Sequence, residues 1–154
     1  MREQIIALLK ERGVSLEQIA QIAYSLQKQY ASGLGHEQCL AAVHSVLNKR
    51  EVQYTLLTGI ALDMLAERNQ LPEPLLAMIK RDEPLYGVDE ILALGITNLY
   101  GSIALTGFGY LDKTKPDVIG RLDSQCCSGR VHTFLDDLVA GIAAAASSKI
   151  AHQM

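Results

Sequence analysis

Apolar residues recur at helical spacing along most of the chain, and no segment shows the alternation of apolar and polar positions that is typical of a surface strand. A short helix is predicted over residues 2–12. Ser15 followed by Gln18 is the signature of a capping box, which predicts a second helix from about Leu16. The pattern therefore predicts an all-α fold.

The same spacing continues into the second half of the chain. Residues 37–69 predict a third helical region with a break near residues 49–51 or at Gly59. Prolines and glycines then interrupt the pattern, and further helices are expected over residues 75–81, 118–123 and 134–152. These elements predict a single multi-helix bundle that spans residues 1–154 as one domain.

Residues 91–111 contain no charged side chain. Such a stretch is long enough to span a bilayer, but polar residues and glycines interrupt it. Gly95, Ser102 and Gly109 recur every seven residues, and a seam of small residues lets another helix approach closely. We interpret this stretch as a fully buried, glycine-rich central helical region of a soluble bundle rather than a membrane span, and we expect self-association along the seam.

Two pairs of adjacent acids precede apolar helical segments, namely Asp89-Glu90 and Asp136-Asp137. Acids in the first turn of a helix favour its dipole, and Thr133 with Asp136 resembles a capping box. Alternatively, buried carboxylates that lack an ion-pair partner are typical of metal sites. Oxygen ligands suit Mg²⁺, with Mn²⁺ or Ca²⁺ as substitutes, and Mg²⁺ is often shared with a substrate phosphate. The second interpretation therefore predicts chemistry on a phosphate ester.

Composition narrows the choice of function. The formal net charge is -3 and no basic stripe is present, so nucleic-acid binding is disfavoured. Aromatic residues make up 5% and Trp is absent, which predicts an aliphatic, Ala-rich core. The three cysteines do not form the even set of a secreted disulfide framework, so we expect reduced thiols in the cytoplasm.

Four elements in the second half resemble the phosphatidylglycerophosphatase A family, most strongly over residues 86–152. They are an Asp-Glu pair at a helix start, a Leu-Asp-x-x-Lys-Pro element, a Gly-containing loop and an Asp-Asp-Leu-Val-Ala-Gly helix. In this sequence they read Val88-Asp89-Glu90, Leu111-Asp112-Lys113-Thr114-Lys115-Pro116, Ser128-Gly129 and Asp136-Asp137-Leu138-Val139-Ala140-Gly141. The resemblance implies a helical, Mg²⁺-dependent phosphatase acting on a glycerophosphate-type ester such as phosphatidylglycerophosphate.

The resemblance also implies roles for single residues. Asp89, Glu90, Asp136 and Asp137 would hold Mg²⁺, Glu90 would orient the attacking water as a base, and Lys115 would neutralise the phosphate. Asp112 is the third candidate catalytic residue. In a continuous helix it would lie about 33 Å from Glu90, so the chain folds back near Tyr100-Gly101 or Gly107-Gly109, or Asp112 serves another subunit, or it is structural.

The expected partner is a phosphate ester or a phospholipid head group, with peripheral contact to a membrane. The polar, amphipathic first half of the chain resembles the soluble branch of the family. It lacks the Gly-Thr-x-Gly-Ser loop of the membrane-embedded members, which leaves a non-catalytic helical binding or regulatory protein as the alternative function.

Three further residue groups have less specific interpretations. Lys49-Arg50-Glu51 with Asp63 is interpreted as a solvated face or a helix pairing. His132 lies four residues before Asp136 and is either a donor to it or a loop residue near a helix start. Cys126 and Arg130 are too close in sequence for the phosphate-binding loop of a thiol phosphatase.

Overall fold

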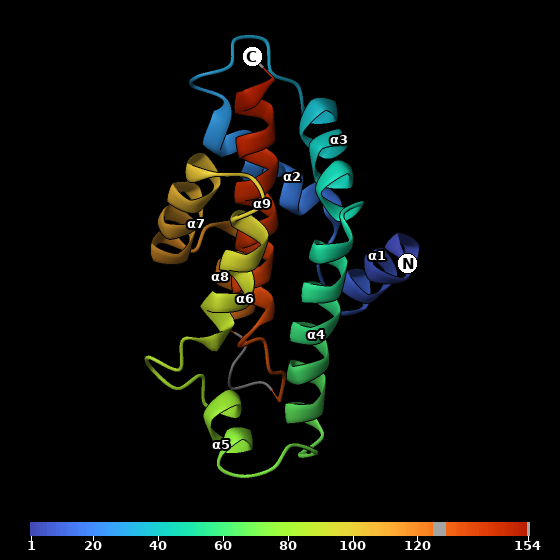
Figure 1. The fold of residues 1–154 in the computed structure, drawn as a ribbon, viewed down its shortest axis with the longest axis vertical. Helices are drawn as coiled ribbons and strands as arrows, with labels where there is room; N and C mark the ends of the chain where they lie inside the picture. Colours follow the sequence, from blue (N-terminus) through green and yellow to red (C-terminus); the bar gives the residue numbers. More distant parts are fainter. Residues whose placement is uncertain (125–128, 154) are drawn as a thin grey trace.

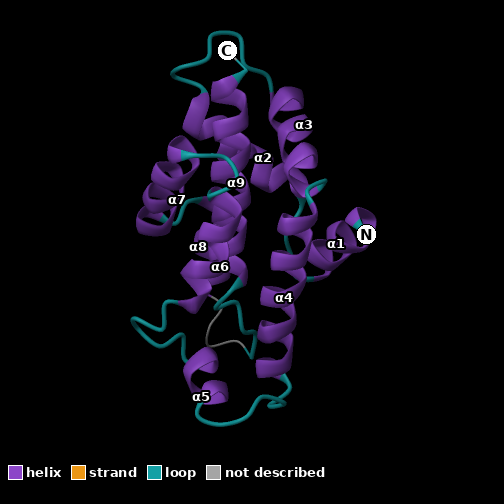
Figure 2. Ribbon diagram, in the orientation of Figure 1, coloured by secondary structure: helices purple, strands orange, loops and turns teal. Residues whose placement is uncertain are grey.

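The computed structural model describes residues 1–124 and 129–153, and within these ranges it contains helices and no strand (Figures 1 and 2). Short loops join helices that mostly pack side by side. The helices are α1 (Arg2–Glu11), α2 (Leu16–Gln27), α3 (His36–Leu47), α4 (Arg50–Glu67), α5 (Leu75–Lys80), α6 (Val88–Thr97), α7 (Ser102–Thr114), α8 (Asp117–Ser124) and α9 (Leu135–His152).

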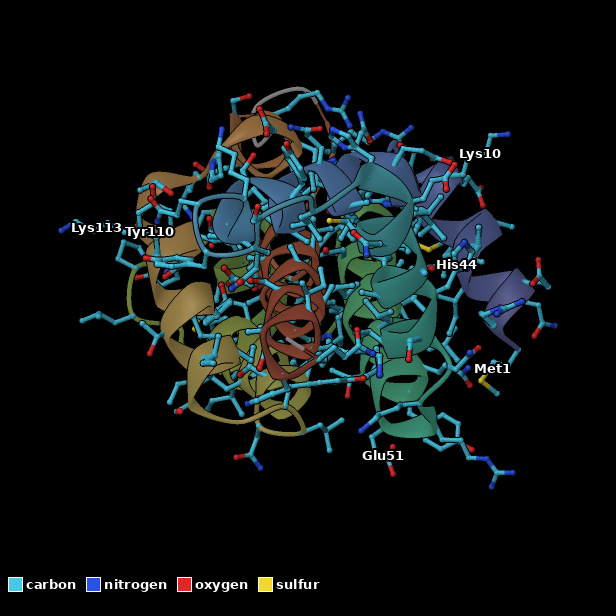
Figure 3. All side chains as sticks on the ribbon, turned by 90° about the horizontal axis from the view of Figure 1, so that it is seen from above. Met1, Lys10, His44, Glu51, Tyr110 and Lys113 are labelled. Atoms are coloured by element: carbon cyan, nitrogen blue, oxygen red, sulfur yellow. The ribbon has the colours of Figure 1, made fainter. Side chains whose placement is uncertain are left out.

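The last helix, α9, forms the centre of the bundle. It packs against α2, α3, α4, α6, α7 and α8, and the end-on view shows it enclosed by its neighbours (Figure 3). Residues 135–148 are all buried. The run of alanines from Ala143 to Ala146 leaves little side-chain bulk between helices, so the surrounding helices can approach closely. The predicted Ala-rich core is therefore this helix and its immediate neighbours.

Residues 91–111 are not the fully buried region that the sequence predicts. α6 ends at Thr97, the chain turns, and α7 begins after Gly101, whose φ of 92° lies in the left-handed region. The outward faces of both helices are solvated, with Ile91 62% and Leu105 53% exposed. The prediction that residues 91–111 are fully buried is wrong because α6 and α7 each pack against α9 through one face and expose the other.

The small-residue seam lies largely on the solvated side of α6 and α7. Ser102 is exposed, and a methyl group added at Gly95 or Gly109 would meet no atom within 4 Å. Self-association along this seam stays a prediction. No helix among the described residues has the length and apolar character needed to cross a membrane.

Local sequence signals locate several helix boundaries. Ser15 and Gln18 form the predicted capping box: the backbone N–H of Gln18 donates to Ser15 Oγ at 3.2 Å, and the backbone N–H of Ser15 donates to Gln18 Oε1 at 2.9 Å. The region over residues 37–69 breaks at Asn48–Lys49, as one of the two alternatives predicts. Gly59 stays within α4, where it faces α9 so closely that a methyl group would lie 2.5 Å from a Leu138 methyl.

Candidate functional site

The first turn of α9 places two acids in the interior of the molecule. Asp136 and Asp137 are each only 4% exposed. The backbone N–H of Asp137 donates to Asp136 Oδ1 at 2.9 Å. No basic group of the same helix turn accompanies them. Their charges must therefore be balanced by groups from other elements or by a bound cation.

Two other helix ends bring candidate residues to the same place. Gly87, with φ of 79°, precedes α6 and directs Asp89 and Glu90 into its first turn. At the C-terminal end of α7, Asp112 lies in the last turn, and Lys115 caps the helix in a left-handed conformation. Because the chain reverses between α6 and α7, the end of α7 returns to the start of α6.

All six residues predicted for the site line one hollow of about 190 Å³. The fold-back near Tyr100-Gly101 removes the separation expected for a continuous helix, so Asp112 shares the hollow with Glu90 within one chain. Larger hollows exist, but the one of about 540 Å³ between α2 and α7 is lined only by uncharged residues. The six residues are Asp89, Glu90, Asp112, Lys115, Asp136 and Asp137.

Three further acids that sequence reasoning missed line the same hollow: Asp82, Glu83 and Asp123. Asp82 and Glu83 belong to the loop after α5, and Asp123 lies near the end of α8. No sequence signal separates them from ordinary surface acids, since each depends on how its loop or helix end is folded. Among the described residues, eight carboxylates and one lysine therefore surround this hollow.

The ammonium group of Lys115 is the cation that bridges two of these carboxylates. Its Nζ lies 3.3 Å from Asp112 Oδ1 and 3.6 Å from Asp136 Oδ2. Partial burial lowers the pKa of Lys115, but the charges of Asp136 and Asp112 outweigh this and raise it above its ordinary value. Lys115 is therefore a permanent positive charge between α7 and α9.

One lysine does not neutralise the cluster. Burial is the main reason that the pKa values of Asp136 and Asp137 are raised. The charges of Asp82 and Asp123 raise the pKa of Asp136 further. The pKa of Asp137 is raised further by Asp136 and Asp89. The pKa of Glu90 is also raised, by burial and then by the charge of Asp112. The free protein retains protons where isolated carboxyl groups would have lost theirs.

The acidic donors of this hollow suit a hard divalent cation, because they are carboxylate oxygens and no His or Cys of the described residues lines it. Lys115 Nζ lies between two of these carboxylates, so part of their charge is already balanced by a cationic side chain of the protein. In the described part of the chain, however, no three acidic, His or Cys side chains are already arranged around a common metal position. Asp89, Asp136 and Asp137 would therefore have to rearrange before they could hold Mg²⁺ together.

Two interpretations of neighbouring residues are corrected. Thr133 does not cap α9, because its hydroxyl donates to the carbonyl of Ile79 at 2.6 Å. Asp63 is not on a solvated face: it is fully buried and accepts hydrogen bonds from the N–H groups of Phe134 and Leu135. The cap of α9 comes from another helix, which a local motif does not reveal.

His132 is a buried residue in front of α9. Its carbonyl accepts from the N–H of Asp136 at 3.3 Å, and its ring nitrogen Nδ1 lies 3.5 Å from Arg12 Nη2. Burial, followed by the charge of Arg12, lowers the pKa of His132 to about 4, so the ring is neutral near pH 7. Cys126, Cys127 and Ser128 lie outside the described residues.

Fold and site together define an all-helical protein with a polyacidic hollow at the N-terminal end of its central helix. The model of the phosphatidylglycerophosphatase A family matches residues 5–152, and the chain belongs to this family. The resemblance drawn from its sequence motifs is thereby confirmed. Family membership indicates a phosphatase-like function.

Relatives and solved structures agree with this assignment over nearly the whole chain. The uncharacterised protein YutG of Bacillus subtilis is 51% identical, covering 99% of this chain and 92% of YutG. YpjQ of the same organism is 54% identical, covering 94% of this chain and 81% of YpjQ. The crystal structure of the low temperature requirement C protein from Listeria monocytogenes has a TM-score of 0.95 and 49% identity, covering 99% and 95% of the two chains.

A protein of unknown function from Bacillus stearothermophilus has the same fold, with a TM-score of 0.96 and 52% identity, covering 99% of this chain and 94% of that one. At this level of identity the arrangement of helices around α9 is shared, and the all-α architecture predicted from the sequence is confirmed.

Proposed function

We propose that this protein is a Mg²⁺-dependent phosphatase that hydrolyses a glycerophosphate-type phosphomonoester, with a phospholipid head group as the substrate class. One observation carries the proposal. Acids from the start of α6, the end of α7 and the start of α9 surround a single hollow that also contains a lysine. Carboxylates suit the metal, and the lysine suits the phosphate that accompanies it.

The proposed roles of the residues that line the hollow follow from their positions. Asp89, Asp136 and Asp137 are the least exposed predicted ligands and would hold the cation. A bound Mg²⁺ would polarise a phosphoryl oxygen and favour deprotonation of a bound water. Glu90 is exposed at the edge of the hollow, and its raised pKa suits a group that receives a proton.

Lys115 and Asp112 form the phosphate side of the site. The Nζ of Lys115 reaches both Asp112 and Asp136, so a small rotation would transfer this charge from the carboxylates to a phosphate oxygen. Asp112 would then hold Lys115 in place when the phosphate is absent. Both residues come from the end of α7, whereas the proposed metal ligands come from α6 and α9.

Turnover measurements test this proposal. We expect release of phosphate from phosphatidylglycerophosphate in mixed micelles with Mg²⁺ and none with excess chelator. Asp137→Asn should lower kcat/KM by more than about 100-fold, since loss of even an outer-shell partner typically costs 10–100-fold. Asp117→Asn is the matched control, because Asp117 is an exposed acid two residues beyond Lys115 and outside the hollow.

The non-catalytic alternative has its own support in the absence of a Gly-Thr-x-Gly-Ser loop from the sequence. Calorimetry with Mn²⁺ separates the two functions. Metal binding that Asp137→Asn abolishes, without turnover of any phosphomonoester, would favour a binding or regulatory protein. Absence of both metal binding and turnover in the wild-type protein would contradict the proposed phosphatase.

A further inference from the structure

The backbone that leads into α9 is held by an ion pair between two other helices. Arg12, just after α1, donates to both carboxylate oxygens of Glu67 at 3.0 and 2.6 Å. Arg12 also donates to the carbonyl of Val131 at 2.9 Å, and Glu67 accepts from the N–H of Val131 at 2.8 Å. Both backbone groups of Val131 are therefore fixed by a bidentate charge pair whose guanidinium is buried.

A third charged residue holds the next part of the segment. Asp63 of α4 is fully buried. Its two carboxylate oxygens accept from the N–H of Phe134 at 3.0 and 3.2 Å, and Oδ2 also accepts from the N–H of Leu135 at 3.0 Å. These are donors of the helix N-terminus that α9 leaves unpaired. Asp63 thus fixes the position at which α9 begins.

This group of three residues, Arg12, Asp63 and Glu67, does not line the acidic hollow. It contacts the backbone immediately before Asp136, whose own N–H donates to the carbonyl of His132 within the held segment. Asp136 and Asp137 directly follow the held segment in the first turn of α9. Any displacement of residues 131–135 would therefore move both carboxylates relative to Asp89 on α6 and Lys115 on α7.

The choice of a charged cap also favours a positioning role. Burial is the main reason that the pKa of Asp63 is raised, and the charge of the nearby Asp136 adds to this rise. A neutral Ser, Thr or Asn cap would satisfy a helix N-terminus without this repulsion. The two carboxylate oxygens of Asp63, in contrast, together accept from two successive N–H groups, so this side chain restricts the helix start more tightly than a cap with a single acceptor oxygen.

We propose that Arg12, Asp63 and Glu67 are positioning residues that set the place and direction from which α9 presents Asp136 and Asp137 to the cation and phosphate. The inference rests on the proposed function. It assigns a role in the proposed metal and phosphate site to three residues that do not line the hollow, one after α1 and two on α4. Metal and substrate sites need ligands that are held to within a fraction of an ångström. We call Arg12, Asp63 and Glu67 the clamp, because together they would hold the start of α9 in this way.

The test compares two clamp variants with a matched control on the same helix. Asp63→Asn is isosteric and replaces one carboxylate oxygen with an amide group that cannot accept a hydrogen bond, whereas Glu67→Gln weakens the pair with Arg12. Ser147→Ala is the control, because it removes a buried hydrogen bond between α9 and Gln27 of 3.0 Å near the other end of α9. For each protein, Mn²⁺ affinity is measured by calorimetry and amide hydrogen exchange is measured along α9.

We expect both clamp variants to bind Mn²⁺ at least about tenfold more weakly, the effect typical of residues that orient ligands. Amide exchange should accelerate selectively at residues 134–137, while residues 142–148 keep their protection. Ser147→Ala should show unchanged Mn²⁺ affinity. A clamp variant with unchanged affinity, or a control that loses as much affinity as the clamp variants, would overturn the inference.

The two proposals fail in different ways. If wild-type protein binds no Mn²⁺ and hydrolyses no phosphomonoester, the proposed phosphatase is wrong. The exchange data then decide the positioning role alone. Selective loss of protection at residues 134–137 in Asp63→Asn supports the role, and uniform protection along α9 overturns it.

Discussion

At the scale of single residues, Lys115 has two competing attractions. Its ammonium group neutralises part of the acidic cluster through Asp112 and Asp136. Under the proposed function the same group is needed by the phosphate. A divalent cation that enters the cluster repels Lys115, whereas a phosphate attracts it. Removal of this charge should therefore affect the two ligands in opposite directions.

We expect Lys115→Met to bind Mn²⁺ more tightly and inorganic phosphate more weakly. Loss of one positive charge a few ångströms from the cation is worth about 1 kcal/mol or more at a solvated site, so Mn²⁺ affinity should rise about fivefold or more. Calorimetry with Mn²⁺ and inhibition by phosphate check the two directions. Lys113→Met is the control, because Lys113 projects outward from α7 (Figure 3); an equal effect in both variants would contradict a specific role.

At the scale of helices, local signals predict where several elements begin, but they do not predict which faces become buried. The capping box at Ser15 depends on residues three apart, and the structure contains it. The burial of residues 91–111 and the cap supplied by Asp63 depend instead on partners far away in sequence. For this reason, hydropathy predicted burial for residues 91–111, which are partly exposed, and charge predicted a solvated position for Asp63, which is buried.

The crossing of α6 and α9 depends on Gly141. A methyl group there would lie 3.2 Å from the carbonyl oxygen of Ala93 on α6, which is tighter than ordinary packing. Gly141→Ala should lower the free energy of unfolding by about 1–3 kcal/mol through overpacking. Gly95→Ala on the open side of α6 should raise it by about 0.5–1 kcal/mol, because alanine is the better helix former.

Urea unfolding of both glycine variants measures these changes. Since α6 also carries Asp89 and Glu90, Gly141→Ala should in addition weaken Mn²⁺ binding, whereas Gly95→Ala should not. If Gly141→Ala proves as stable as Gly95→Ala, α6 can shift outward without loss and its distance from α9 is not fixed by this contact.

At the scale of the whole molecule, charge is distributed very unevenly. The sequence has 17 acidic and 14 basic residues, yet in the part of the chain that the structure describes eight of the acids surround one hollow together with a single lysine. Six of these nine residues could be predicted because they lie in motifs at helix ends. Asp82, Glu83 and Asp123 could not, because only the packing of α5 against α4 and of α8 against α9 brings them to the site.

This concentration of acids predicts that the metal-free protein loses stability as the pH rises. The pKa values of Asp136, Asp137 and Glu90 are raised, mainly by burial. The folded state therefore holds protons that the unfolded chain has released above about pH 4. Below about pH 7.5, His132 opposes this slope, because its folded pKa is about 4 and only the unfolded chain still binds a proton on that ring. Between pH 7.5 and 8.5, His132 is neutral in both states. Partial burial would raise the pKa of Glu67, but the hydrogen bond from Arg12 outweighs it and lowers this pKa, so Glu67 is ionised in both states.

Urea unfolding at intervals between pH 7.5 and 8.5, where His132 is neutral in both states, tests this sign. We expect the free energy of unfolding to fall with rising pH, by up to about 1.4 kcal/mol per pH unit for each proton that only the folded state retains. Asp137→Asn should flatten the slope, since an amide releases no proton and one carboxylate of the cluster is gone. Saturating Mg²⁺ should also reduce the slope by neutralising the acids. A wild-type stability that stays constant or rises over this range would mean that the carboxylates ionise freely in the folded protein, and the electrostatic argument for a cation at this site would then be wrong.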